Sequence, residues 1–181
     1  MKLLSKLAGA TALMMVAAAG ATAQNPPAAP AAAAPAPEYV SIPMEITVNK
    51  PAAEVWAKVG ADYCALGKWI AAGREVPCVV TSGTGGIGSV RKIANTVIEV
   101  LTAKTDLSYG YTQPAVAGKF YNLYHGFLEA KPIDAKSSKL IYTLMLDVSD
   151  KPDKAAKDTD VANRRKQFEA ALANMKAIAE K

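Results

Sequence analysis

The stretch from residue 75 to residue 148 most constrains the fold, because it consists of six strand-like segments in direct succession. Each segment is rich in apolar, β-branched or aromatic residues, and turns containing Gly, Pro or Asp separate them. Such a succession predicts the neighbouring strands of an antiparallel meander. The expected strands span residues 75–82, 89–95, 96–104, 107–113, 119–132 and 139–148.

A seventh strand is expected earlier in the chain, over residues 39–49. Apolar and mostly polar residues alternate there, which is the period-two pattern of a strand with one buried face. Pro43 lies within this pattern and has no backbone N–H group to donate to a neighbouring strand. We therefore expect it at a bulge or at an outward, unpaired position. The apolar positions are Val40, Ile42, Met44, Ile46 and Val48.

Three helices complete the expected order of elements. Pro51 begins a first short helix that ends at Gly60, and a second covers residues 61–71. A polar stretch over residues 149–157 leads to a long amphipathic helix. Its apolar residues keep a helical spacing and predict a face packed on the sheet. They are Val161, Phe168, Leu172, Met175 and Ile178.

The first 23 residues have the pattern of a signal peptide. Lys2 and Lys6 precede an apolar stretch that is too short and alanine-rich for a membrane span. The stretch ends in Ala21-Thr22-Ala23, a small-x-small cleavage pattern, so we expect a mature protein that begins at Gln24. This predicts a periplasmic or secreted protein with no membrane span in its mature form.

Residues 24–37 are expected to form a disordered linker, because they are almost entirely Ala and Pro. Residues 38–181 then form one domain, which we expect to be monomeric. Of the 21 basic residues, 19 remain after cleavage against 16 acidic ones, a net charge of +3. This charge is too small to favour nucleic acid as a partner. The basic run Arg164-Arg165-Lys166 is expected on a solvated helix face.

Cys64 and Cys78 are predicted to form a disulfide, since an exported protein meets an oxidising compartment. Two buried free thiols are the alternative. Their separation does not match a zinc-ligand pair, and the chain contains one histidine, so no metal site is expected.

The glycine-rich segment at residues 83–88 matches the G-x-G-x-x-G pattern of dinucleotide-binding turns. In those turns a helix follows at once and presents its amides to a pyrophosphate. Here the strand-like residues 89–93 follow instead. The segment is therefore expected to form a hairpin turn, and no cofactor is expected.

Five short segments follow one another at a characteristic spacing from residue 46 onward. They are Ile46 to Trp56 (ITVNKPAAEVW), Trp69, Gly88-Ser89-Val90-Arg91, Val97 to Leu101 and Leu107-Ser108-Tyr109. In these segments the chain is similar to the START/Bet v 1-like (SRPBCC) superfamily, in its polyketide cyclase/dehydratase-like branch. The similarity implies an α+β helix-grip fold, in which a curved seven-stranded antiparallel sheet, two short helices and a long C-terminal helix enclose a cavity. It also places Cys64 on the second helix and Cys78 on the following strand.

The inward faces of the strands are the candidate cavity walls. On strand 107–113 this face is Leu107, Tyr109 and Tyr111, because the other face has Ser108, Gly110 and Thr112. On the last strand it is Tyr142, Leu144 and Leu146. On strand 119–132 we favour Tyr121, Leu123, His125 and Phe127, but the opposite set with Phe120, Asn122 and Tyr124 stays open. Phe168 and Leu172 are expected to contribute from the helix.

Arg91 and Glu99 match an inward-facing arginine and glutamate of relatives such as the plant abscisic-acid receptors. A buried charge needs a partner, because isolating it costs several kcal/mol. A bridge between them would provide one and offer polar atoms to a ligand. The alternative is that both lie on the solvated face.

These observations favour a periplasmic binding or carrier protein for a small hydrophobic or amphipathic ligand, which requires an enclosed cavity of a few hundred Å³. The alternative is a cyclase/dehydratase-like enzyme with His125, Glu99 and Tyr109 as acid/base groups. We favour binding, because cyclase substrates are made on cytoplasmic carriers, and no catalytic residue is assigned. A structural domain without a cavity is the third hypothesis.

Overall fold

The computed structural model describes residues 36–114 and 124–181. It contains the expected strands and helices in the expected order. The elements are β1 (Tyr39–Val48), α1 (Ala52–Val59), α2 (Leu66–Trp69), β2 (Cys78–Ser82), β3 (Val90–Ile93), β4 (Val97–Lys104), β5 (Ser108–Thr112), β6 (Tyr124–Pro132), β7 (Ser138–Asp147) and α3 (Lys154–Ala179).

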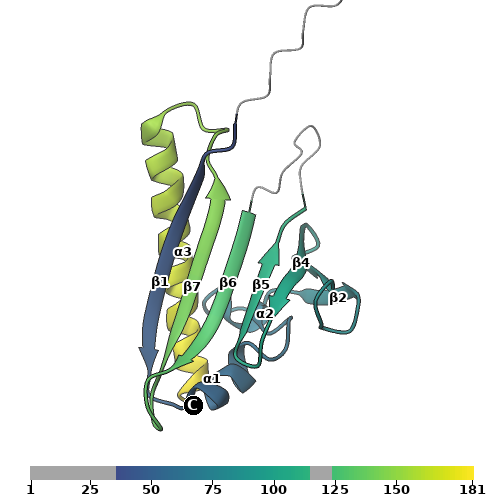
Figure 1. Ribbon diagram of the computed structural model, residues 1–181, viewed down its shortest axis with the longest axis vertical. Coiled ribbons are helices and arrows are strands. Elements are labelled where there is room, and N and C mark those ends of the chain that lie inside the picture. The colour runs from purple at the N-terminus through teal and green to yellow at the C-terminus, as the bar shows by residue number, and fades with distance from the viewer. Residues whose placement is uncertain (1–35, 115–123) are drawn as a thin grey trace, which may run out of the picture. The chain divides into compact units, whose positions relative to one another are not determined.

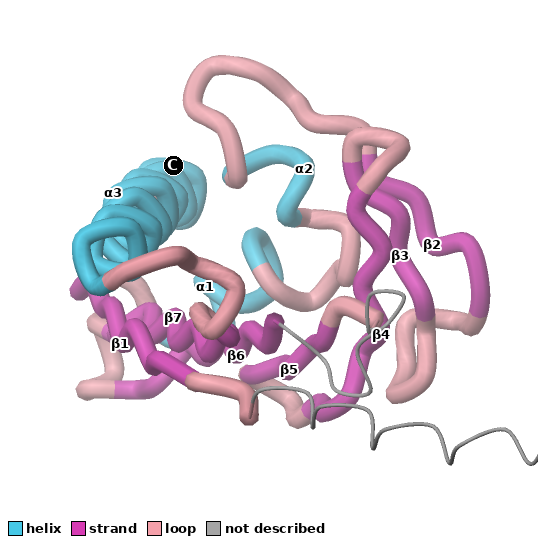
Figure 2. The backbone as a smooth tube through the Cα atoms, turned by 90° about the horizontal axis from the view of Figure 1, so that it is seen from above, coloured by secondary structure: helices cyan, strands magenta, loops and turns pink. Residues whose placement is uncertain are grey.

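The seven strands form one antiparallel sheet in the order β1-β7-β6-β5-β4-β3-β2. Strands β2 to β7 form the predicted meander, and the first strand, β1, pairs with β7 at one edge of the sheet. The strands follow a curve from β1 and β7, beside α3, round to β2 and β3, while α1 and α2 lie on the concave side (Figures 1 and 2). This is the helix-grip fold.

The helix ends follow from local chemistry. Pro51 precedes α1, and the amide of Gly60 ends it with a bond to the Trp56 carbonyl. The Asp153 carboxylate accepts a bond from the Ala156 amide at 2.8 Å and caps the start of α3.

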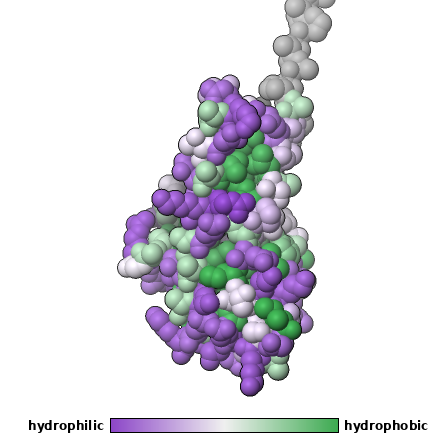
Figure 3. Space-filling model, turned by 90° about the vertical axis from the view of Figure 1, so that its left-hand side faces the viewer, coloured by the Kyte–Doolittle hydropathy of each residue, from purple (hydrophilic) through white to green (hydrophobic). Residues whose placement is uncertain are grey.

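The side of the domain with β1 and α3 is mostly hydrophilic, with separate hydrophobic patches (Figure 3).

Helix α2 is shorter than the predicted span of residues 61–71. The Asp62 side chain accepts a bond from the Cys64 amide at 2.8 Å, which holds residues 62–64 in a turn. At the other end, Gly67 lies against the chain at Val76, whose amide donates to the Gly67 carbonyl at 2.7 Å. These contacts limit the helix to about one turn.

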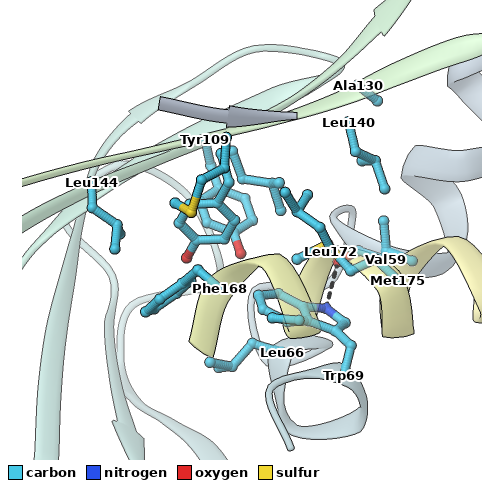
Figure 4. Close-up of a cluster of buried hydrophobic side chains, with 14 of the residues drawn as sticks. Val59, Leu66, Trp69, Tyr109, Ala130, Leu140, Leu144, Phe168, Leu172 and Met175 are labelled. Atoms are coloured by element: carbon cyan, nitrogen blue, oxygen red, sulfur yellow. Dashed lines mark hydrogen bonds between the residues drawn. The ribbon is translucent and has the colours of Figure 1, made fainter. Parts of the chain in front are cut away.

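The core lies between the concave face of the sheet and the three helices. Trp69 is fully buried in it, and its indole N–H donates to the Val59 carbonyl at 3.0 Å (Figure 4). Tyr142 and Phe168 pack beside it with ring centroids 4.9 Å apart. Val161 and Ile178 of α3 are partly buried against this core, and Phe168, Leu172 and Met175 are fully within it.

The predicted inward faces are correct on two strands. Tyr109 and Tyr111 of β5 are buried in the core, with Leu107 half-buried beside them. Tyr142, Leu144 and Leu146 of β7 are buried in the same way. Pro43 of the edge strand β1 lies on the exposed face, as expected.

The favoured inward face of β6 is wrong where the structure describes it, and Tyr124 of the alternative set lies on the buried face; Phe120 and Asn122 of that set lie outside the described residues. Leu128 and Tyr124 point into the core, whereas His125 is half-buried and Phe127 is exposed on the opposite face. The inner face has Gly126 opposite Tyr111, so it has a gap in its apolar pattern that hides the alternation. Two further residues of the favoured set, Tyr121 and Leu123, lie outside the described residues.

The glycine-rich segment forms the turn between β2 and β3, as predicted. Gly83, Gly85 and Gly88 have positive φ angles, which glycine adopts at little cost. The segment leads into strand β3 rather than a helix. Within residues 36–114 and 124–181, no helix has the length and apolar character needed to cross a membrane.

Candidate cavity between the sheet and the long helix

A cavity of about 140 Å³ lies between α3, α2 and the concave face of the sheet. It is smaller than the few hundred Å³ expected for a carrier, and its rim includes partly exposed side chains, among them Val97 and Arg164. Its walls come from seven described elements, α2, β3, β4, β5, β6, β7 and α3, and from the adjoining loops. The lining residues are Leu66, Ile70, Ile93, Val97, Glu99, Tyr111, Gln113, Tyr124, Tyr142, Arg164, Gln167 and Phe168.

Four aromatic rings form much of the wall. The hydroxyl groups of Tyr111 and Tyr142 are hydrogen-bonded to each other at 2.8 Å. Tyr124 lies next to Tyr111, with ring centroids 6.2 Å apart, and Phe168 lies next to Tyr142. Burial raises the pKa of Tyr111 and Tyr142 well above the ordinary value, so both hydroxyls are neutral. The rings therefore present an uncharged, mainly apolar surface.

A buried ion pair lies at the inner end of the cavity, and of its two residues Glu99 lines the cavity. The β3–β4 register places Arg91 opposite Glu99. Arg91 donates from Nε at 2.8 Å and from a terminal nitrogen at 2.6 Å, both to Glu99 Oε2. The other terminal nitrogen donates to the Tyr63 carbonyl. Both residues are buried, so the inward alternative for this pair is correct.

The Glu99 carboxylate, not Arg91, faces the cavity. Oε2 is occupied by Arg91, whereas among the described residues Oε1 receives a single long contact, of 3.4 Å, from the Gln113 amide. An ionised carboxylate oxygen can accept more than one hydrogen bond. The inner end of the cavity therefore offers acceptor capacity to a ligand.

The structure brings four of the predicted binding residues together at the cavity. These are Glu99, Tyr111, Tyr142 and Phe168. Four others are buried in the core without lining it, namely Arg91, Tyr109, Leu144 and Leu172. Leu107 is half-buried at the edge of the core, and His125 lies on the opposite face of the sheet.

Tyr109 was expected in the cavity wall but fills the core beside it. Its ring centroid lies 5.6 Å from those of Trp56 and Tyr63, and 6.2 Å from that of Tyr111. The Arg91 guanidinium lies over Tyr63 at 4.1 Å and over Tyr111 at 5.0 Å. This cation–aromatic cluster occupies the concave space and accounts for the small cavity.

Sequence reasoning missed several lining residues, among them Arg164 and Gln167 of α3. They precede Phe168 by four residues and one residue on α3, so Arg164 shares its face. That spacing was the available signal. The predicted position on a solvated helix face is correct for Arg165, which pairs with Glu169 at 3.6 Å. Arg164 lies instead at the cavity rim.

Cys64 and Cys78 form the predicted disulfide, with Cα atoms 5.4 Å apart. Cys64 lies in the turn just before α2 rather than on the helix, and Cys78 begins β2. The bond therefore ties the helical segment to the far end of the sheet. Among the described residues, no group of three or more His, Cys, Asp or Glu side chains is placed to hold a metal ion.

Comparison with known proteins decides the family. The sequence model described as "Polyketide cyclase / dehydrase and lipid transport" matches residues 39–180, which is nearly the whole described domain. The chain belongs to this family. Members of the polyketide cyclase/dehydrase and lipid transport family share the START/Bet v 1-like fold seen here. No match was found among the curated proteins.

Solved structures show the same fold at low sequence identity. The Zhui aromatase/cyclase from Streptomyces sp. R1128 is 19% identical, with a TM-score of 0.59 over 79% of this chain and 94% of that one. Ara h 8.0201 is 19% identical, with a TM-score of 0.54 over 76% and 98%. A Thermobifida fusca protein is 22% identical, with a TM-score of 0.58 over 75% and 90%.

Proposed function

We propose that this protein is an exported binding or carrier protein for a small amphipathic molecule with one aromatic or similarly flat ring. The observation that supports this most directly is the cavity of about 140 Å³, which has aromatic walls and one buried carboxylate. An apolar cavity of about 150 Å³ in another protein accommodates benzene. The cavity does not reach the few hundred Å³ required for a larger ligand, so its size suits one ring, with any larger part of the ligand extending past the rim.

A cyclase/dehydratase activity is less well supported by the arrangement of acid/base groups. Of its three candidate groups, His125 lies on the opposite face of the sheet and Tyr109 lies outside the cavity wall. Glu99 lines the cavity, but Arg91 holds one of its oxygens with two hydrogen bonds. A folded polyketide chain would also need more room than one ring does.

Binding can be tested by filling the cavity from its rim. Val97 lines the cavity and is 36% exposed, so Val97→Phe can be accommodated while its ring enters the site. Val79 of β2 is 52% exposed and does not line the cavity, so Val79→Phe is the matched control. We expect p-cresol to bind wild type and Val79→Phe equally, and Val97→Phe about tenfold more weakly.

The measurement is a calorimetric or NMR titration of mature protein. Saturable binding that Val97→Phe leaves unchanged would place the ligand elsewhere. If neither p-cresol nor other single-ring probes bind wild type, and native mass spectrometry of purified protein shows no co-purifying compound, the binding function is wrong.

Export is the second part of the proposal. It is supported by the basic and apolar N-terminal pattern and by the Cys64–Cys78 disulfide, a bond typical of proteins outside the cytoplasm. Periplasmic protein is expected to begin near Gln24 and to contain no free thiol when denatured without reductant. N-terminal sequencing that finds Met1 in this fraction would contradict it.

A further inference from the structure

The geometry points to a ligand with two polar ends: a hydroxyl or amine donor at its buried end and a carboxylate or similar anion at the rim. This inference rests on the proposed binding function and specifies its ligand as the class of aromatic hydroxy or amino acids. The cavity has three zones that match such a molecule, an acceptor at the inner end, aromatic rings in the middle and donors at the rim.

The inner zone selects a donor. Glu99 is buried, and its remaining acceptor capacity is on Oε1, which within the described part of the chain has only the 3.4 Å contact from Gln113. Arg91 balances the charge of the Glu99 carboxylate and does not line the cavity. A ligand hydroxyl or amine can therefore donate to Oε1, whereas a ligand carboxylate at the same place would be repelled.

The rim zone selects an anion through Arg164. Its side chain is 40% exposed, and its Nε lies 3.8 Å from the Asp160 carboxylate, a loose pair at the surface. The guanidinium lies 5.7 Å from the centre of the Tyr124 ring. Arg164 donates no hydrogen bond to another described residue, whereas Arg91 and Arg165 both do. Its planar set of donors can thus bind a carboxylate.

The charges beyond Arg164 restrict where the anion can lie. A second hollow of about 180 Å³ shares Gln113, Tyr124 and Arg164 with the cavity, and its other walls include Asp147, Asp150 and Asp160. Asp150 pairs with Lys151 at 3.1 Å and Asp160 with Arg164 at 3.8 Å, and the concentration of carboxylates here disfavours an anion that extends past Arg164. The anion is therefore held on the cavity side, beside the neutral amide of Gln167.

The test compares three single-ring probes by calorimetric titration of mature protein. 4-Hydroxyphenylacetate has both polar ends, phenylacetate lacks the donor, and p-cresol lacks the anion. We expect 4-hydroxyphenylacetate to bind about tenfold tighter than either of the others, since a charge-assisted hydrogen bond is lost in each case. Added salt should weaken the binding of 4-hydroxyphenylacetate and phenylacetate, which both carry a carboxylate, but not the binding of p-cresol.

A matched pair of variants assigns the rim end. Arg164→Gln should remove the roughly tenfold advantage of 4-hydroxyphenylacetate over p-cresol. Arg165→Gln, also on α3 and 43% exposed but away from the cavity, should leave this advantage unchanged. The donor end is tested with ligands alone, because changing Glu99 would leave Arg91 buried without a counter-charge.

The outcomes separate this inference from the binding function. If p-cresol binds but the carboxylate adds no affinity, or Arg164→Gln and Arg165→Gln behave alike, the two-ended ligand is wrong and ring binding stands. Equal binding of phenylacetate and 4-hydroxyphenylacetate overturns the donor end. If none of the three probes binds, the proposed function itself fails.

Discussion

At the scale of single residues, the polar groups of the interior are nearly all paired. Arg91 has the Glu99 carboxylate and the Tyr63 carbonyl, and Tyr111 and Tyr142 share one hydrogen bond. The Tyr63 hydroxyl is an exception, because it is buried and has no hydrogen-bond partner among the described residues. A buried group left unpaired costs about 1–3 kcal/mol.

Replacing Tyr63 by Phe removes this unpaired hydroxyl and keeps the ring under Arg91. We expect the free energy of unfolding to stay constant or to rise by up to about 1 kcal/mol. Tyr142→Phe is the matched control, since it breaks the 2.8 Å bond to Tyr111 and should lower that free energy by about 1 kcal/mol. Urea denaturation measures both. A larger loss for Tyr63→Phe than for Tyr142→Phe would show that the Tyr63 hydroxyl has a partner.

At the scale of secondary structure elements, a glycine of β6 makes room for a tyrosine ring of β5. Gly126 lies opposite Tyr111 in the register, and the Tyr111 ring occupies the space where a Gly126 side chain would be. This fit allows a ring to lie flat on the sheet inside the cavity wall. The inner face of β6 is thus shaped by a missing side chain.

Gly126→Ala should force the buried Tyr111 ring out of position. A Cβ at residue 126 would overlap the ring and its hydroxyl, so we expect a loss of about 1–3 kcal/mol and weaker binding of p-cresol. Gly86→Ala provides the control, because a Cβ there meets no atom within 4 Å. Thermal unfolding and the probe titration check both effects. Equal stability of the two variants would contradict the close approach of Tyr111 and β6.

At the scale of the whole molecule, one aromatic and cationic cluster links the helices to the sheet. Tyr63 comes from the turn before α2, Tyr109 and Tyr111 from β5, and Tyr142 from β7. Burial raises the pKa of each of these tyrosines above its ordinary value, and that of Tyr124 as well. Their ionisation is therefore coupled to unfolding of the whole domain.

This coupling predicts alkaline unfolding. The tyrosines are neutral in the folded domain, while in the unfolded chain they ionise near pH 10. Stability is therefore intact below about pH 10 and falls as the pH rises above it, by about 1.4 kcal/mol per pH unit for each such tyrosine. Urea denaturation between pH 8 and pH 11 measures the slope, and tyrosinate absorbance should appear with unfolding. Ionisation of these tyrosines near pH 10 in folded protein would contradict the prediction.

The order of elements and most strand faces could be predicted from the sequence, because they depend on local patterns. The alternation in β1, β5 and β7 points the right side chains inward, since neighbouring side chains of a strand lie on opposite faces. The turn at residues 83–88 could be predicted for the same reason, as its glycines precede a strand pattern. The pairing of Cys64 with Cys78 could be predicted from the oxidising compartment that is expected for an exported chain.

The tertiary structure alone decided the inner face of β6, the size of the cavity and the position of Arg164 at its rim. Gly126 breaks the apolar alternation, and only its pairing with Tyr111 shows which face is buried. The cavity is small because Arg91 and Tyr109, distant in sequence from α1 and its Trp56, meet in the same concave space. Such contacts depend on how the sheet curves round the helices, and no local pattern encodes that curvature.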